Sequence, residues 1–180
     1  MLLLLACASS PDSESPADTG EPACADGIDV GECPPDVTLV DQDGSSVSLL
    51  SFAGAATVLA SEAGWCSSCQ DLAEGLGALY EDRKADGLVV VDVIVEGVDY
   101  APADAEDAAD WAAYFDLTYP VLADPDGVFL PAYGGDISSA PFVFFVLDGD
   151  GAITWTNPRE DGTTLDQITT AVDDVLGDGS

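Results

Sequence analysis

Two cysteines separated by two residues are the part of this sequence best suited to chemistry. They are Cys66 and Cys69, in the stretch GWCSSCQ that runs from residue 64 to residue 70. Thiols at this spacing can work as a redox pair, supply half of a metal site, or form a structural bridge. The chain has no histidine, so histidine-dependent triads and histidine-ligated zinc or copper sites are excluded.

The elements expected around the pair favour the redox role. An apolar strand is predicted over residues 56–64, and a helix is predicted to begin at about Cys66. Free N–H groups and the helix dipole at such a position favour a thiolate and lower the pKa of the thiol. Cys69 lies one helical turn further on, so it can resolve a mixed disulfide formed on Cys66. Trp65 would shield the pair and offer a flat surface to a partner.

Two other interpretations of the pair stay open. Cys24 and Cys33 could complete an all-thiolate zinc site, but they are nine residues apart and do not form a second tight knuckle. The second alternative is an inert structural bridge between the paired cysteines. In an oxidising compartment, Cys24 and Cys33 would instead form a structural disulfide with each other. We expect no metal and no other cofactor.

The amino terminus suggests export. The segment MLLLLAC, residues 1–7, resembles the end of a bacterial lipoprotein signal, in which Cys7 would be lipidated. The run is short and has no basic residue before it, so we expect the signal to begin upstream of Met1. Residues 8–34 are rich in Ser, Pro, Asp, Glu and Gly, which predicts a disordered acidic tether. The chain is therefore expected in the cell envelope, periplasmic or surface-exposed, and lipid-anchored.

The net charge excludes several classes of partner. There are 35 acidic and three basic residues, which gives a formal net charge of −32. Nucleic-acid binding is excluded because it needs Lys and Arg to displace counterions, and electrostatic docking on anionic lipid is excluded for the same reason. Hydrophobic residues make up 47% of the chain, so most of it is expected to fold.

Strands and helices are expected to alternate in one layered domain over residues 35–178. Two short alternating runs around Asp43 and Gly44 predict a hairpin. The apolar residues that follow the cysteines recur at three- and four-residue spacing, which predicts a helix that stops at Gly87. Further elements are predicted as a buried strand at 88–97, a helix at 104–116, two strands within 141–156 and a closing helix at 164–178.

Four stretches then give a resemblance to a known family. PPDVTLVDQDGSSVSL, GWCSSCQ, YPVLADPDG and SSAPFVFFVLDGDGAI resemble, in order and spacing, the redoxin branch of the thioredoxin-like superfamily. The closest likeness is to the membrane-anchored, TlpA-like thiol:disulfide oxidoreductases, and it covers about residues 35–177. The resemblance implies an α/β thioredoxin fold, with a mixed sheet of four or five strands flanked by helices and an N-terminal hairpin extension.

The resemblance also assigns roles to the loop before the last two strands. It implies that Pro141, which follows Ala140, is a cis-proline facing the disulfide, because an X-Pro bond is where the cis form costs little. Such a loop offers its backbone groups to a bound polypeptide. The alternative for Pro141 is an ordinary trans proline that opens a strand.

The chain departs from the family where a proton must be transferred. Members of this branch commonly carry a carboxylate shortly after the second cysteine, and the matching position here is Leu72. Asp71 and Glu74 lie close by but out of register, and surface carboxylates of this kind are usually only solvated. Glu62, four residues before the first cysteine, has two possible roles. It is either a buried proton acceptor near the second cysteine or an ordinary carboxylate at a strand end, the more frequent case.

These observations predict a thiol:disulfide oxidoreductase that exchanges disulfides with exported proteins. Cys66 would attack the substrate disulfide and Cys69 would resolve the mixed disulfide, with Trp65, Ala140 and Pro141 at the substrate contact. A thiol donor or acceptor in the membrane is the expected electron partner.

Two alternative functions remain open. One is a non-catalytic envelope lipoprotein that uses the thioredoxin fold as an interaction module. The other is a thiol peroxidase. Peroxiredoxins place Thr or Ser three residues before the reactive cysteine, and this chain has Ala63 there.

Overall fold

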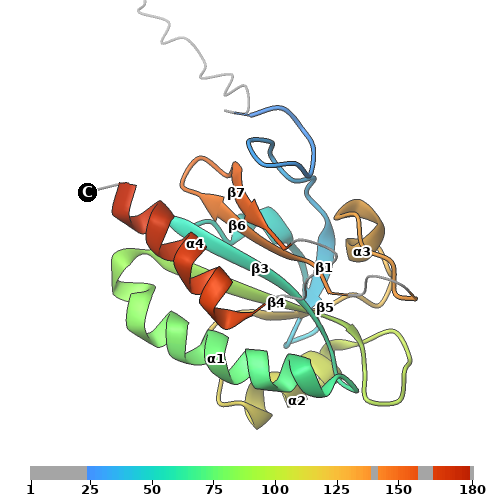
Figure 1. The fold of residues 1–180 in the computed structure, drawn as a ribbon. Helices are drawn as coiled ribbons and strands as arrows, with labels where there is room; N and C mark the ends of the chain where they lie inside the picture. Colours follow the sequence, from blue (N-terminus) through green and yellow to red (C-terminus); the bar gives the residue numbers. More distant parts are fainter. Residues whose placement is uncertain (1–23, 139–141, 158–163, 179–180) are drawn as a thin grey trace, which may run out of the picture.

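A seven-stranded mixed sheet runs through the computed structural model, which describes residues 24–138, 142–157 and 164–178 (Figure 1). Over these residues the strand order is β2-β1-β5-β4-β3-β6-β7. The strands are β1 (Thr38–Asp41), β2 (Ser46–Ser48), β3 (Ala56–Ala63), β4 (Leu88–Glu96), β5 (Val121–Ala123), β6 (Phe144–Asp148) and β7 (Ile153–Thr156).

The central strands are buried on both faces. β3 runs parallel to β4 and antiparallel to β6, and each of its eight residues is buried. Sheets covered on both sides select continuous apolar strands, which explains the runs ATVLASEA and LVVVDVIVE. The polar residues Ser61, Glu62 and Asp92 interrupt these runs at fully buried positions.

Helices cover the two faces unequally. α1 (Ser67–Arg83) and α4 (Leu165–Asp178) lie side by side over one face, where Arg83 forms an ion pair with Asp173 (Figure 1). α2 (Ala105–Tyr114) packs on the same face, against β5 and its neighbours. The short α3 (Phe129–Ala132) lies on the opposite face, where the ring of Tyr133 meets Phe145 at 5.4 Å. Short 3-10 turns follow β2 at Leu49–Ser51 and α1 at Lys84–Asp86.

The N-terminal hairpin is part of the main sheet. β1 pairs with β2 across the turn predicted at Asp43 and Gly44, and Gly44 has the positive φ of 80° that such a turn requires. β1 also pairs antiparallel with β5. The expected count of four or five strands is therefore too low, because the hairpin joins the sheet edge instead of standing apart from it.

A disulfide-closed loop opens the described part of the chain. Cys24 and Cys33 are bonded, with their Cα atoms 5.4 Å apart. The N–H of Gly31 donates to the carbonyl of Ile153, and the N–H of Ile153 donates to the carbonyl of Glu32, both at 2.8 Å. Residues 24–34, which we assigned to the tether from their composition, are thus held against β7 by covalent and backbone bonds that composition does not reveal. Cys7 and residues 8–23 lie outside the described residues.

No helix in the described ranges combines the length and the apolar composition needed to cross a membrane.

Candidate functional site

The two cysteines lie where β3 passes into α1. Cys66 has extended backbone angles and serves as the N-cap of α1, while Cys69 lies in its first turn. The N–H of Cys69 donates to Sγ of Cys66 at 3.2 Å, and Oγ of Ser68 lies 3.2 Å from the same sulfur. The structure shows the two residues joined as a disulfide, with their Cα atoms 5.3 Å apart. When the disulfide is reduced, these donors and the helix dipole stabilise negative charge on Cys66.

Both cysteines are largely covered. Cys66 is 5% exposed and Cys69 is 3% exposed. A substrate disulfide can therefore reach Sγ of Cys66 only in close contact with the residues that surround it. Of the two sulfurs, that of Cys69 is set further along the helix, which suits it to an intramolecular step.

An aromatic cluster forms one side of the site. The indole Nε1 of Trp65 donates to Oε2 of Glu96 at 2.8 Å. Its ring stacks on Tyr100 at 5.3 Å between centroids and meets Phe142 at 6.0 Å. Tyr100 is 67% exposed, so the stack presents an aromatic surface to solvent. Trp65 therefore forms part of an aromatic surface together with Tyr100, a residue that sequence reasoning missed.

The loop that carries Tyr100 is held tightly against the end of β3. A Cβ atom at Gly64 would lie 2.8 Å from the backbone N of Val98, so only glycine permits this approach. Tyr100 itself has a φ of 66°, a conformation that costs a non-glycine residue free energy. Nothing in the local sequence indicates that Tyr100 adopts a left-handed backbone conformation.

The segment that enters β6 is fixed beside Trp65 by two polar side chains. Oγ of Ser61 accepts from the N–H of Val143 at 2.8 Å. The side chain of Asn157 accepts from the N–H of Phe144 at 2.9 Å and donates to the carbonyl of Phe142 at 3.2 Å. Sequence reasoning missed both side chains.

Ala140 and Pro141, the residues that lead into this segment, lie outside the described residues. Their substrate contact and the cis bond stay predictions.

A pair of buried carboxyl groups lies on the face of the sheet that α1 and α2 cover. Glu62 is completely buried, and neither of its oxygens has a hydrogen-bond partner among the described residues. Asp92 is equally buried; its Oδ2 accepts from the hydroxyl of Tyr119 at 2.9 Å and from Nε1 of Trp111 at 3.4 Å. In the strand register Asp92 is beside Ala60, two residues from Glu62, so the two carboxyl groups are diagonal neighbours on one face.

The surroundings of this pair raise the pKa of both groups. Burial raises the pKa of Glu62 well above its usual range, and the nearby Asp92 adds to the effect. Burial raises the pKa of Asp92 to about 7, although the hydrogen bonds from Tyr119 and Trp111 oppose the rise. A carboxyl group with a pKa of about 7, as at Asp92, can take up and release a proton near neutral pH.

The predicted proton-transfer residues therefore differ sharply in environment. Asp71 and Glu74 are exposed on α1, as expected for solvated carboxylates, and Leu72 packs partly against the core. Glu62 is the buried one of the three. Asp92 was missed, although an acidic residue in the middle of the apolar run LVVVDVIVE is a sequence signal that could have revealed it.

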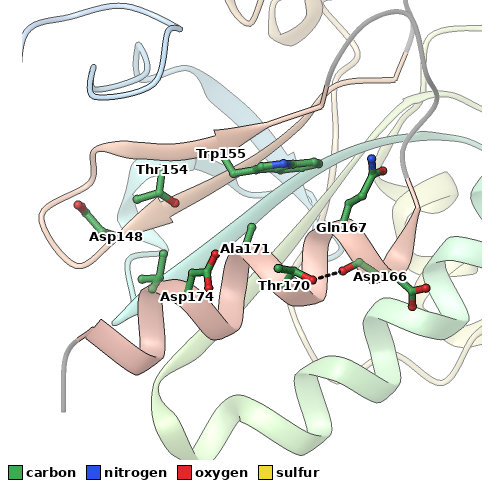
Figure 2. A pocket seen from close by; sticks show the side chains of 9 residues that line it. Asp148, Thr154, Trp155, Asp166, Gln167, Thr170, Ala171 and Asp174 are labelled. Carbon is green, nitrogen blue, oxygen red and sulfur yellow. Dashed lines mark hydrogen bonds between the residues drawn. The ribbon is translucent and has the colours of Figure 1, made fainter.

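A groove unrelated to the cysteines lies between β7 and α4. It has a volume of about 540 Å³. Figure 2 shows Thr154 and Trp155 contributing from β7 and Asp174 from α4. None of its lining residues belongs to the strand end, loop or helix start around Cys66, so we do not assign it to the redox site.

Comparison with known proteins agrees with this geometry. One relative, the thiol-disulfide oxidoreductase ResA of Bacillus thuringiensis subsp. konkukian, is 24% identical over 126 residues, covering 70% of this chain and 68% of ResA. Solved structures of other proteins share the fold. An uncharacterized conserved protein from Geobacillus kaustophilus has a TM-score of 0.71 at 22% identity, over 84% of each chain. A putative thiol:disulfide interchange protein DsbE from Chlorobium tepidum has a TM-score of 0.67 at 23% identity, over 84% of this chain and all of DsbE.

The predicted α/β thioredoxin fold is therefore confirmed, and the CxxC pair at Cys66 and Cys69 occupies the strand-to-helix junction predicted for it. The family model described as "AhpC/TSA family" matches residues 30–156, which is more than half of the sequence. This chain belongs to the AhpC/TSA family.

Proposed function

We propose that this chain is an extracytoplasmic thiol:disulfide oxidoreductase that exchanges disulfides with exported proteins through Cys66 and Cys69. The observation that carries the proposal is the position of Cys66 as the N-cap of α1, with the N–H of Cys69 directed at its sulfur. That arrangement stabilises the thiolate, which is the form that attacks a disulfide. The likeness to ResA and DsbE supports the same activity.

The exchange has two balanced steps when the dithiol reduces a substrate. The Cys66 thiolate attacks one sulfur of the substrate disulfide, forms a mixed disulfide, and releases the other substrate sulfur as a thiolate that takes up a proton. The Cys69 thiol then loses its proton and attacks Sγ of Cys66. The second substrate thiolate leaves, and two electrons have passed from the dithiol to the substrate. In the opposite direction the same steps oxidise a substrate dithiol.

Glu62 is proposed as the acceptor of the Cys69 proton. It is a buried carboxyl group near the end of β3, and burial raises its pKa, which makes its ionised form a stronger base than an ordinary carboxylate. Asp71 and Glu74 lie in solvent and cannot offer the same environment.

Export and anchoring are proposed on separate observations. The described cysteines are paired in two disulfides, and disulfides persist in oxidising compartments outside the cytoplasm. The lipoprotein-like segment that ends at Cys7 would attach the domain to a membrane through an acidic tether. A membrane thiol protein would then exchange electrons with the Cys66–Cys69 pair.

Trapping tests the proposal. In a Cys69→Ser variant the mixed disulfide on Cys66 cannot be resolved, so covalent complexes with exported proteins should accumulate and be identified by mass spectrometry. A Cys66→Ser variant is the matched control and should trap nothing. If Cys69→Ser trapped no exported protein in a native cell envelope, the interaction-module alternative would replace this one.

A further inference from the structure

A second groove is lined by residues on both sides of the cysteines in the sequence. It lies between the start of α1 and the helix α2, next to the loop that follows β4, and has a volume of about 590 Å³. We call it the α1–α2 groove. Its lining includes Gly64, Gln70, Val98, Asp110, Trp111 and Tyr114.

Two residues that line the groove flank the redox pair in the chain. Gly64 and Gln70 both line it, and these residues stand two before and four after Cys66. The side chain of Gln70 donates to the carbonyl of Gly64 at 3.4 Å, so these two lining residues are in contact across the start of α1. An extended polypeptide rises about 3.3 Å per residue, so a segment attached to a cysteine at Cys66 reaches the groove within a few residues.

Two exposed apolar side chains form the groove walls. Val98 is 75% exposed and Tyr114 is 79% exposed, although both are large and apolar. The ring of Tyr114 meets that of Phe115 edge-on at 4.8 Å between centroids, and Phe115 meets Trp111 in the same way at 4.8 Å. Fixed, exposed aromatic and aliphatic groups around a hollow are characteristic of a surface that binds a partner.

The charge around the groove is acidic. Asp107 and Asp110 both line it from α2. Among the described residues the only cations are Arg83 and Lys84, at the other end of α1, where both take part in ion pairs. No cation of this part of the chain therefore neutralises the groove, and a complementary charge has to come from the partner.

We propose that the α1–α2 groove binds the polypeptide segment next to the substrate cysteine and selects a segment that combines an apolar side chain with Lys or Arg. The apolar side chain would pack on Val98 and Tyr114, and the cation would lie against Asp110. The inference rests on the proposed disulfide exchange and adds to it the class of substrate. Because exposed ion pairs are weak and are screened by salt, the selection should be modest and should fade at high ionic strength.

Three substrates and a charge reversal test the inference. One peptide carries a disulfide beside Lys-Phe, a second carries the same disulfide beside Glu-Phe, and hydroxyethyl disulfide has no flanking segment. With the wild-type dithiol, we expect kcat/KM to favour the Lys-Phe peptide by about fivefold. Asp110→Lys should abolish or reverse that preference and leave the rate with hydroxyethyl disulfide unchanged.

Asp174→Lys is the matched control. It makes the same change of charge in the groove between β7 and α4 (Figure 2), whose lining includes neither cysteine. It should keep the preference for the Lys-Phe peptide. An equal loss of preference in Asp174→Lys would show that only total charge matters, and an intact preference in Asp110→Lys would show that the groove is not used. Either result overturns the inference.

A second variant tests the apolar wall without changing charge. Tyr114→Ser alters an exposed side chain, so the fold should persist, and it should raise KM for both peptides while sparing hydroxyethyl disulfide. Unchanged KM values would count against the inference. If the wild-type dithiol reduced neither hydroxyethyl disulfide nor the peptides, the proposed function itself would be wrong. That outcome differs from a loss of selectivity between the peptides.

Discussion

Glu62 and Asp92 lie on the same face of neighbouring parallel strands, and three of their four carboxyl oxygens have no hydrogen-bond partner among the described residues. Two buried carboxylates without a nearby cation repel each other and lose their hydration. At neutral pH at least one of them therefore holds a proton. A site that must take up and release a proton during disulfide exchange can use such a pair.

Replacing Glu62 should slow the resolving step. Glu62→Gln keeps the shape of the side chain but removes the proton acceptor, so attack by Cys69 should fall by on the order of a hundredfold. Rapid-quench measurements should show the mixed disulfide on Cys66 accumulating. Asp71→Asn and Glu74→Gln are controls on the exposed surface and should behave as wild type. A Glu62→Gln variant that resolves at the wild-type rate would remove Glu62 from the mechanism.

The same carboxyl pair should make stability depend on pH. The pKa of Asp92 rises from 3.8 to about 7 on folding, and that of Glu62 rises in the same direction. Between the unfolded and folded pKa values of Asp92, the folded chain binds more protons than the unfolded chain. The free energy of unfolding therefore falls as the pH rises. The contribution is present in full below about pH 4 and is lost as the pH rises through about 7.

Urea unfolding across this pH range measures the effect. Glu62→Gln should lose less stability than wild type as the pH rises, and it should be the more stable of the two at the alkaline end of the range. Asp92→Asn should reduce the dependence of stability on pH in the same way, because an amide oxygen can still accept from Tyr119 and Trp111 but does not titrate. Parallel curves for Glu62→Gln and wild type would show that Glu62 does not titrate abnormally.

The bond from Trp65 to Glu96 should hold the loop that carries Tyr100. Trp65→Phe keeps an aromatic ring but loses the indole donor, and we expect a loss of about 1–2 kcal/mol in the free energy of unfolding. Glu96→Gln keeps an acceptor oxygen and should cost less. A double-mutant cycle on the two positions should give a favourable coupling energy; additive effects would show that the bond contributes nothing.

The second disulfide should contribute stability without taking part in exchange. Cys24 and Cys33 close a short loop on β7, at the opposite end of β3 from the redox pair. Replacing both with Ser should lower the free energy of unfolding by about 2–4 kcal/mol and leave the initial rate of disulfide reduction unchanged. A matching fall in rate measured well below the melting temperature would mean that this disulfide exchanges electrons too.

Local patterns predicted much of the fold. The turn at Asp43 and Gly44, the buried strand at 88–97 and the junction at Cys66 were each marked by residue type or period, and the structure has an element at each place. The helix predicted at 104–116 forms as Ala105–Tyr114, with Asp104 and Asp107 in a capping box. The short α3 was missed because four residues give no measurable period.

Features set by tertiary contact were beyond local patterns. The stack of Tyr100 on Trp65 joins two loops. It depends on the positive φ of Tyr100, which a tyrosine in a sequence does not predict. The pairing of β1 with β5 joins segments about 80 residues apart, so no short window of sequence contains it. The sequence alone could not decide between the two roles of Glu62. Its burial depends on how α1 and the neighbouring elements pack over β3, and a local pattern does not contain that information.

The most direct test of the whole account is the rate at which the reduced chain cleaves an accessible protein disulfide, such as that of insulin. Wild type should turn over in the presence of a thiol donor, and Cys69→Ser should stop at one mixed disulfide per molecule. Cys66→Ser should show no reaction above background. If Cys66→Ser reduced the disulfide as fast as wild type, Cys66 would not be the attacking residue and the proposed mechanism would be contradicted.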